Sequence, residues 1–149
     1  PCAIRYNRGT LPSIPLDTPV EYGRWETVKE AGGITVIAEG RLVRTALSAA
    51  EGLDAAVINA RFINPADTVL LDRAAAGSKC IITLEDGIVK GGLGSAVAEY
   101  LCGKTKLVTL GMPERPVLHA SIAQQDEECG ISAAMVRAEI ERAIAEAVK

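Results

Sequence analysis

Two adjacent carboxylates, Glu85 and Asp86, follow an apolar run, and a glycine-rich stretch comes directly after them. A pair of carboxylates at the end of a strand can supply a general acid and a general base. Carboxylates in this position more often cap a helix or lie in a solvated loop, and we favour that interpretation. Acid–base chemistry at Glu85 and Asp86 is therefore a hypothesis to which the sequence adds no further support.

The glycine-rich stretch, Gly87–Ser95, is a candidate for binding a nucleotide phosphate. Gly92–Val97 approximates the dinucleotide fingerprint G-x-G-x-x-G, but Val97 stands where Gly or Ala is needed. The stretch also lacks the G-K-[ST] ending of a phosphate-binding loop. We favour a structural turn, because glycine accepts positive φ angles and close backbone approach. An independent nucleotide-binding domain stays an alternative that titration with ATP or NAD would test.

Arg5 and Arg8 flank Tyr6 and Asn7 near the start of the chain. In an extended segment, side chains at i and i+3 point to opposite faces, so only one of the two arginines need contact a ligand. A guanidinium beside a glycine suits phosphate, because its planar fork donates to two oxygens. A surface salt bridge explains the same spacing equally well.

The other reactive side chains form no recognisable constellation. His119 is the single histidine and lies beside Val117 and Leu118, which favours a structural or loop role. The four cysteines are far apart and form no C-x-x-C pair, so we expect reduced thiols and neither disulfides nor zinc. They are Cys2, Cys80, Cys102 and Cys129.

The elements that must position these residues alternate between strands and helices. Apolar, β-rich runs predict strands at 34–39, 55–60, 79–84 and 106–110. Helical spacing predicts helices at 42–50, 66–76, 96–102 and 121–129, and a long final helix capped by Ser132. We expect Asn64 to cap the second helix, Pro65 to occupy its first position, and Asp67 to favour its positive end.

This alternation predicts an α/β fold. Right-handed βαβ crossovers give a parallel sheet covered by helices on both faces, hence a three-layer sandwich with a mostly parallel sheet of about five strands. Trp25–Lys29 is the candidate for a short, antiparallel edge strand. The parallel strands should all end at one edge of the sheet, at Gly40, Arg61, Glu85 and Gly111.

Composition narrows the class of protein. The chain has 149 residues, 48% of them hydrophobic and 23% charged, which indicates one globular domain. A net charge of −3 without a basic stripe argues against a nucleic-acid partner. No apolar run approaches the roughly 20 residues that cross a bilayer, and no signal peptide is visible, so we expect a cytoplasmic protein without a membrane partner.

The first part of the chain differs from the rest. Residues 1–23 hold four of the seven prolines and show no helical period, so we interpret them as a linker that precedes a domain over 24–149. The chain begins at Pro1 without a methionine, and we expect it to be a piece of a longer protein.

Four segments, in this order, resemble the 1-deoxy-D-xylulose-5-phosphate synthase family of transketolase-type enzymes. The family patterns are A-x-R-Y-P-R-G, N-A-R-F-I-K-P-L-D, T-x-E-E…G-G-x-G-S-A-V and G-x-P-D…H-G. The matching segments are Ala3–Gly9, Asn59–Asp67, Thr83–Val97 and Gly111–His119. The departures are Asn7 for Pro, Asn64 and Ala66 for Lys and Leu, and Ala120 for the Gly after the histidine.

The resemblance implies the C-terminal domain of a transketolase-type enzyme, with residues 1–23 as the end of the preceding pyrimidine-binding domain. The complete family member joins pyruvate to glyceraldehyde 3-phosphate, with loss of carbon dioxide, at the start of the non-mevalonate isoprenoid route. It uses thiamine diphosphate and Mg²⁺. The second arginine of R-Y-P-R-G binds the substrate phosphate in that family, and this role carries over to Arg8.

The same resemblance places the cofactors on domains that this chain does not contain. Glu85-Asp86-Gly87 lacks the Gly before Asp of the family's diphosphate-and-metal motif, and no Asn follows Asn64 to serve as a metal ligand. We therefore predict no catalytic, cofactor-binding or metal-binding residue here, and an isolated chain that is inactive. The expected partners are the missing cofactor-binding domains of the same enzyme and a second copy in a homodimer.

A second hypothesis comes from a different functional class. The C-terminal domain of a 2-oxoacid dehydrogenase β subunit shares the expected fold and serves as a docking surface for a partner protein. The R-Y-x-R-G pattern around Arg8 favours the synthase-like hypothesis. Recovery of an acyltransferase core in a pull-down would favour the docking domain.

Overall fold

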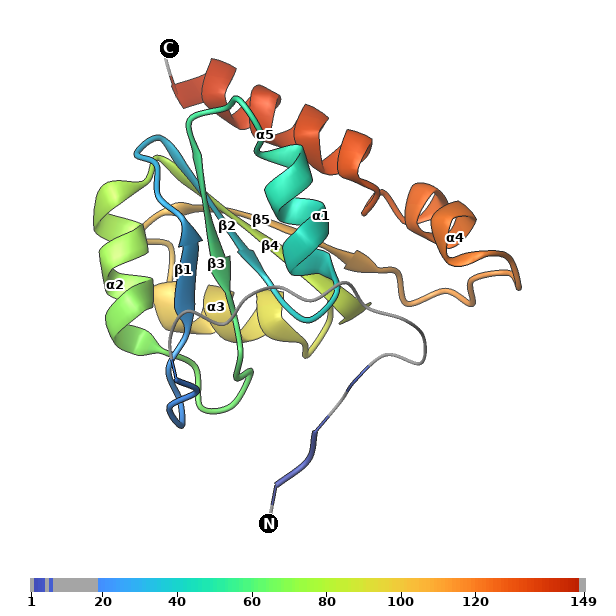
Figure 1. Cartoon of the computed structure of the whole chain (residues 1–149), viewed down its shortest axis with the longest axis horizontal. Helices are drawn as coiled ribbons and strands as arrows, with labels where there is room; N and C mark the ends of the chain where they lie inside the picture. Colours follow the sequence, from blue (N-terminus) through green and yellow to red (C-terminus); the bar gives the residue numbers. More distant parts are fainter. Residues whose placement is uncertain (1, 5, 7–18, 148–149) are drawn as a thin grey trace.

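Strands and helices alternate along the chain in the computed structural model, which describes residues 2–4, 6 and 19–147 (Figure 1). The elements in chain order are β1 Glu26–Lys29, β2 Ile34–Ala38, α1 Leu42–Ala49, β3 Ala55–Asn59, α2 Thr68–Gly77, β4 Cys80–Ile88, α3 Leu93–Leu101, β5 Lys106–Met112, α4 Ile122–Glu128 and α5 Ala133–Ala147. Each strand and helix expected from the sequence is present within this range. Arg8, the predicted phosphate ligand, lies outside the described residues.

The described strands form one five-stranded sheet in the order β1-β3-β2-β4-β5. The pairs β2–β3, β2–β4 and β4–β5 are parallel, and β1 pairs with β3 antiparallel. Both the mostly parallel sheet and the antiparallel edge strand are thus confirmed.

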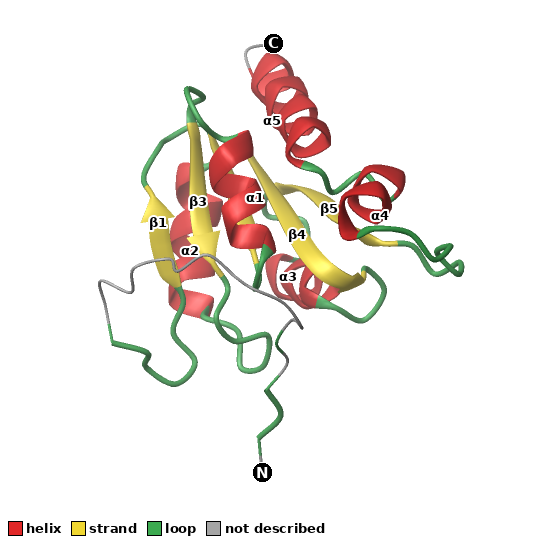
Figure 2. Cartoon of the chain, turned by 45° about the vertical axis from the view of Figure 1, so that its right-hand side comes forward, coloured by secondary structure: helices red, strands yellow, loops and turns green. Residues whose placement is uncertain are grey.

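Helices cover both faces of this sheet, as Figure 2 shows. On one face, α1 and α5 bury Leu42, Val136 and Ile140 against β2, β3 and β4. On the other face, α2 and α3 bury Leu71 and Val97 against the opposite side of the same strands. The expected three-layer sandwich is confirmed, with one apolar core on each side of the sheet.

Three local predictions are wrong. Asn64 does not cap α2, because Asn64-Pro65 is a cis peptide in the preceding loop and the N-cap is Asp67, whose carboxylate accepts from the Leu70 N–H at 3.0 Å. Pro65 does not occupy the first helical position, since α2 begins at Thr68. The third parallel strand does not end at Leu84, because β4 continues to Ile88.

The two last helices begin at the expected positions, and the predicted cap of the final helix, Ser132, is confirmed. Ser121 caps α4 through a reciprocal capping box with Gln124, and the Ser132 hydroxyl accepts from the Met135 N–H at the start of α5. In the part of the chain that the structure describes, no helix combines the length and apolar character needed to span a membrane.

Candidate functional site at the carboxyl edge of the sheet

Glu85 lies in the carboxyl-terminal half of β4 and is buried, with 2% of its surface exposed. Its two carboxylate oxygens accept hydrogen bonds from the N–H groups of Leu93 and Gly94, both at 2.9 Å. These N–H groups form the first turn of α3, where unpaired donors and the helix dipole favour a negative charge. The chain's own carboxylate thus occupies the position in which a strand–glycine–helix corner would hold a phosphate.

Glycines let α3 approach the sheet closely enough for this contact. A Cβ at Gly92 would lie 1.8 Å from a Glu85 carboxylate oxygen, and a Cβ at Gly94 would lie 2.8 Å from Cγ2 of Thr109. The glycine run is therefore required by the packing of α3, which agrees with the structural turn favoured from the sequence. Of the two structural roles weighed for Glu85, the helix cap is present and the solvated loop residue is not.

Asp86 pairs with Arg41, which lies just before α1. The Arg41 guanidinium donates to both oxygens of Asp86, at 2.9 and 3.0 Å, and to both oxygens of Asp126 in α4, each at 2.7 Å. All three side chains are about 15% exposed. The Asp126 bond, followed by that of Asp86, outweighs burial and raises the pKa of Arg41 above its ordinary value. Arg41 thereby fixes α4, none of whose residues is buried, to the edge of the sheet.

A second buried carboxylate lies at this edge. Glu39, at the end of β2, is 9% exposed and accepts from the Asp86 N–H at 3.2 Å. Gly40 and Gly111 lie at the same edge, as the strand endings predicted. The described residues contain no group of three or more His, Cys, Asp or Glu side chains that could hold a metal ion. The amides at the start of α3 bind the Glu85 carboxylate.

The Asn59–Asp67 segment holds the edge strand β1. Asp67 accepts from the Trp25 backbone N–H at 3.0 Å and from Arg24 at 3.3 Å, besides capping α2. Burial alone would raise the pKa of Asp67, but the bonds from Trp25 and Leu70 and the charge of Arg24 outweigh it and lower that pKa. The ionised Asp67 carboxylate thus joins Arg24 and Trp25, just before β1, to the start of α2.

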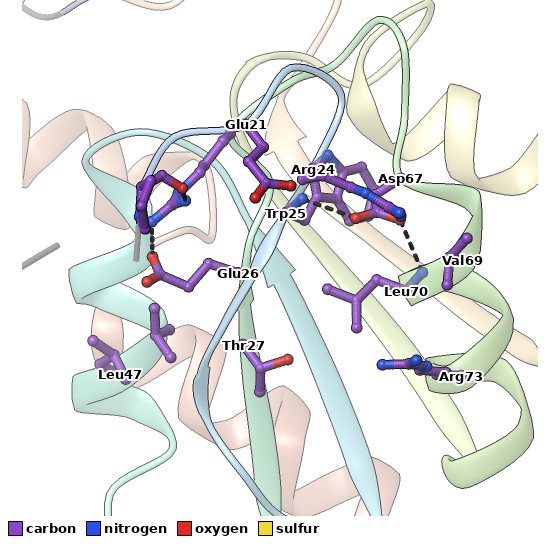
Figure 3. Close-up of a pocket in the computed structure, with 13 residues that line it drawn as sticks. Glu21, Arg24, Trp25, Glu26, Thr27, Leu47, Asp67, Val69, Leu70 and Arg73 are labelled. Atoms are coloured by element: carbon purple, nitrogen blue, oxygen red, sulfur yellow. Dashed lines mark hydrogen bonds and ion pairs between the residues drawn. The ribbon is translucent and has the colours of Figure 1, made fainter. Parts of the chain in front are cut away.

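Two further bonds join this segment to β1. The Trp25 indole donates to the Phe62 carbonyl at 2.7 Å, and Arg61 pairs with Glu26 at 2.5 Å. A groove of about 790 Å³ runs along β1 and is lined from α1 by Leu47 and from α2 by Val69, Leu70 and Arg73 (Figure 3). Two of its arginines are paired with carboxylates, Arg24 with Asp67 and Arg61 with Glu26. These ion pairs connect β1 and the residue before it to the segment between β3 and α2.

The predicted residues fall into three groups. Glu85 and Asp86 lie at the expected edge, where Glu85 binds the amides of α3 and Asp86 binds Arg41. His119 is exposed in the loop after β5. The described cysteines are free, and burial raises the pKa of the Cys80 thiol above its ordinary value.

Sequence reasoning missed Arg41, Asp126 and the capping role of Asp67. Arg41 follows Gly40 directly at a strand end, which was a usable signal. For Asp126 the sequence offered no signal, since this residue lies 85 positions from Arg41 in the chain.

These features define a class: an α/β domain whose carboxyl edge is closed by its own side chains. The chain belongs to the family described as Transketolase, C-terminal domain, whose profile matches residues 23–136. The resemblance drawn from the four sequence segments is therefore confirmed at family level.

Relatives extend this similarity to nearly the whole chain. It is 39% identical to 1-deoxy-D-xylulose-5-phosphate synthase of Pseudomonas savastanoi pv. phaseolicola, over 97% of this chain and 24% of that protein. It is also 39% identical to the synthase of Chlorobium luteolum, over 90% of this chain and 23% of that protein. The chain thus spans about a quarter of the length of the curated relatives it matches.

Solved structures with the same fold were also found. A split-gene transketolase, an inactive beta4 tetramer, superposes with a TM-score of 0.76 at 34% identity, over 87% of this chain and 45% of that chain. A 2-oxoglutarate:ferredoxin oxidoreductase from Magnetococcus marinus gives a TM-score of 0.55 at 16% identity, over 83% of this chain and 20% of that chain. At 16% identity, the second likeness concerns the fold alone.

Proposed function

We propose that this chain is the C-terminal domain of a 1-deoxy-D-xylulose-5-phosphate synthase-like enzyme. The observation that carries the proposal is the 39% identity to such a synthase along 97% of the chain. In this proposal the complete enzyme is a cytoplasmic homodimer that joins pyruvate to glyceraldehyde 3-phosphate for isoprenoid synthesis. Residues 1–23 connect to the preceding domain, and 24–149 form the C-terminal domain.

Thiamine diphosphate and Mg²⁺ belong, in this proposal, to the domains that precede the chain. The bonding of the described carboxylates supports this division, because Glu85 caps α3 and Asp86 is bound to Arg41. The contribution of the domain to catalysis is then structural, apart from one substrate contact in its N-terminal segment. We expect the isolated chain to turn over no substrate.

The substrate contact in this proposal is Arg8, which corresponds to the phosphate-binding arginine of the family pattern. Arg8→Ala in the complete enzyme should raise KM for the phosphorylated acceptor by about tenfold or more, because one charge-assisted hydrogen bond contributes about 1.5–3 kcal/mol. The matched control is Arg5→Ala, which removes a guanidinium three residues away. Steady-state kinetics with pyruvate and glyceraldehyde 3-phosphate would measure both.

Two results would contradict the proposal at different levels. An unchanged acceptor KM in Arg8→Ala would remove the role of Arg8 while leaving the domain assignment in place. A complete enzyme that carries this chain as its C-terminal part and makes no 1-deoxy-D-xylulose 5-phosphate would remove the assignment itself. Mass spectrometry of the product mixture distinguishes the two results.

A further inference from the structure

A long segment between the last strand and the last helix lies outside the hydrophobic core. β5 ends at Met112, and the next buried residue is Ile131, just before α5. None of the residues 113–130, which include α4, is buried, and Figure 1 shows α4 at the end of the molecule opposite β1. The core therefore holds this segment at its two ends and, along its length, only through the partial burial of Cys129.

The bonds within this segment give it a shape of its own. Gln125 donates to the Leu118 carbonyl at 3.1 Å, and Arg115 pairs with Glu128 at 2.7 Å. The largest apolar side chains point to solvent instead of packing on the core, with Leu118 76% and Ile122 59% exposed. The segment is thus a locally bonded unit with few buried contacts, which is the kind of region that opens before the rest of a protein unfolds.

Two ion pairs join this unit to the rest of the described chain, and they differ in strength. Lys90 and Glu114 lie 3.1 Å apart with both side chains more than 60% exposed, so their pair contributes little. Arg41 and Asp126 are each only 14% exposed and share two hydrogen bonds of 2.7 Å. The second pair is therefore the main attachment of the segment to the sheet.

Arg41 also keeps two carboxylates together. The same guanidinium donates to Asp86 of β4, so that Asp86 and Asp126 share one positive charge at low exposure. The N–H groups of Ile131 and Ser132 donate to the Asp126 carbonyl in the turn between α4 and α5. These backbone bonds join uncharged groups, so salt weakens the guanidinium bonds more than it weakens them.

We propose that residues 113–130 form a strap that opens as one unit when the Arg41–Asp126 pair breaks, while both cores stay folded. Because salt screens this pair, ionic strength sets the fraction of chains in which the strap is open. Opening uncovers Arg41 and Asp86 at the carboxyl edge of the sheet. The proposal rests on this ion pair and is independent of the proposed function.

Hydrogen exchange followed by mass spectrometry on the 149-residue chain tests the role of the pair. Asp126→Ala should speed exchange in a peptide covering 121–129 by about tenfold or more, because two charge-assisted hydrogen bonds are lost. Glu127→Ala is the matched control, since it removes the neighbouring, exposed carboxylate of the same helix, and it should change that exchange by less than about twofold. A peptide covering 80–84, in β4, should exchange at the same rate in all three chains.

Ionic strength supplies a second readout. Raising NaCl from about 0.1 M to 1 M shortens the Debye length from about 10 Å to about 3 Å. In the unsubstituted chain, exchange in the peptide covering 121–129 should then rise by about twofold or more. In Asp126→Ala it should not depend on salt, because the screened pair is already absent.

Several results would overturn the proposal. These are equal effects of Asp126→Ala and Glu127→Ala, exchange in 121–129 that ignores salt, and exchange at the rate of a free peptide before any substitution. A rise in β4 exchange that accompanies the rise in α4 would also overturn it, because the opening would then be global. If circular dichroism shows that Asp126→Ala is unfolded, the salt series on the unsubstituted chain decides the question.

Discussion

Replacing Glu85 by Gln tests whether the carboxylate at the start of α3 holds the fold together. Glutamine keeps the shape but has one oxygen, so it can accept from Leu93 or from Gly94 and turns an NH₂ group toward the other. The variant therefore loses one charge-assisted bond, leaves a buried N–H facing another donor, and removes the charge that favours the helix N-terminus.

These losses set the expected magnitude. A buried unsatisfied donor costs about 1–3 kcal/mol, and loss of the charge from the remaining bond and the helix end adds about 1 kcal/mol. We expect Glu85→Gln to lower the free energy of unfolding by about 3 kcal/mol, which is a fall in Tm of roughly 10 °C for a chain of this size. Urea unfolding followed by circular dichroism would measure it.

The matched control is Glu99→Gln, the same exchange at an exposed position of the same helix. It should change the free energy of unfolding by no more than about 0.5 kcal/mol. Glu85→Ala adds a second readout, since sodium formate should raise its Tm more than sodium chloride does, by binding the vacated amides. If Glu85→Gln costs no more than Glu99→Gln, the reasoning about this helix end is wrong.

Two further predictions concern other buried polar groups. Thr83→Val should leave stability unchanged or raise it by about 1 kcal/mol in urea unfolding, because the Thr83 hydroxyl is fully buried without a hydrogen-bond partner among the described residues; a loss above 1 kcal/mol would contradict this. Because the pKa of Asp67 is lowered in the folded state, its stabilisation is complete above the unfolded pKa of about 3.9 and disappears as pH falls through the folded pKa. Asp67→Asn should therefore make stability between about pH 2 and pH 5 less dependent on pH, and unchanged acid-unfolding curves would refute that role.

The fold was largely predictable because its signals are local. Apolar runs of four to six residues such as Ile34–Ala38 and Ala55–Asn59 alternate with helical spacing, and the βαβ rule converts that alternation into a parallel sheet. The antiparallel β1 was also accessible, since it stands apart from the βαβ series and ends before a glycine turn. The carboxyl edge followed from the strand endings alone.

The bonds within that edge were not predictable in the same way. The apolar run stops at Leu84, so a charged residue next to it indicates the end of a strand. β4 nevertheless continues, because the amides at the start of α3 bind the Glu85 carboxylate inside the protein. No feature of the sequence next to Glu85 indicates this contact. The partnership of Arg41 with Asp126 is likewise set by tertiary packing across 85 residues.

In this domain, the residues of the family patterns mostly make structural contacts. Arg61 and Asp67 from the second pattern fasten β1, while Glu85 and Gly94 from the third join β4 to α3. Asp67 and Glu85 tolerate little change, because their carboxylates accept hydrogen bonds from backbone N–H groups inside the fold. A glycine-rich strand–helix corner is therefore weak support for a nucleotide site whenever an acidic residue lies near the carboxyl end of the preceding strand, since that carboxylate can occupy the anion position itself.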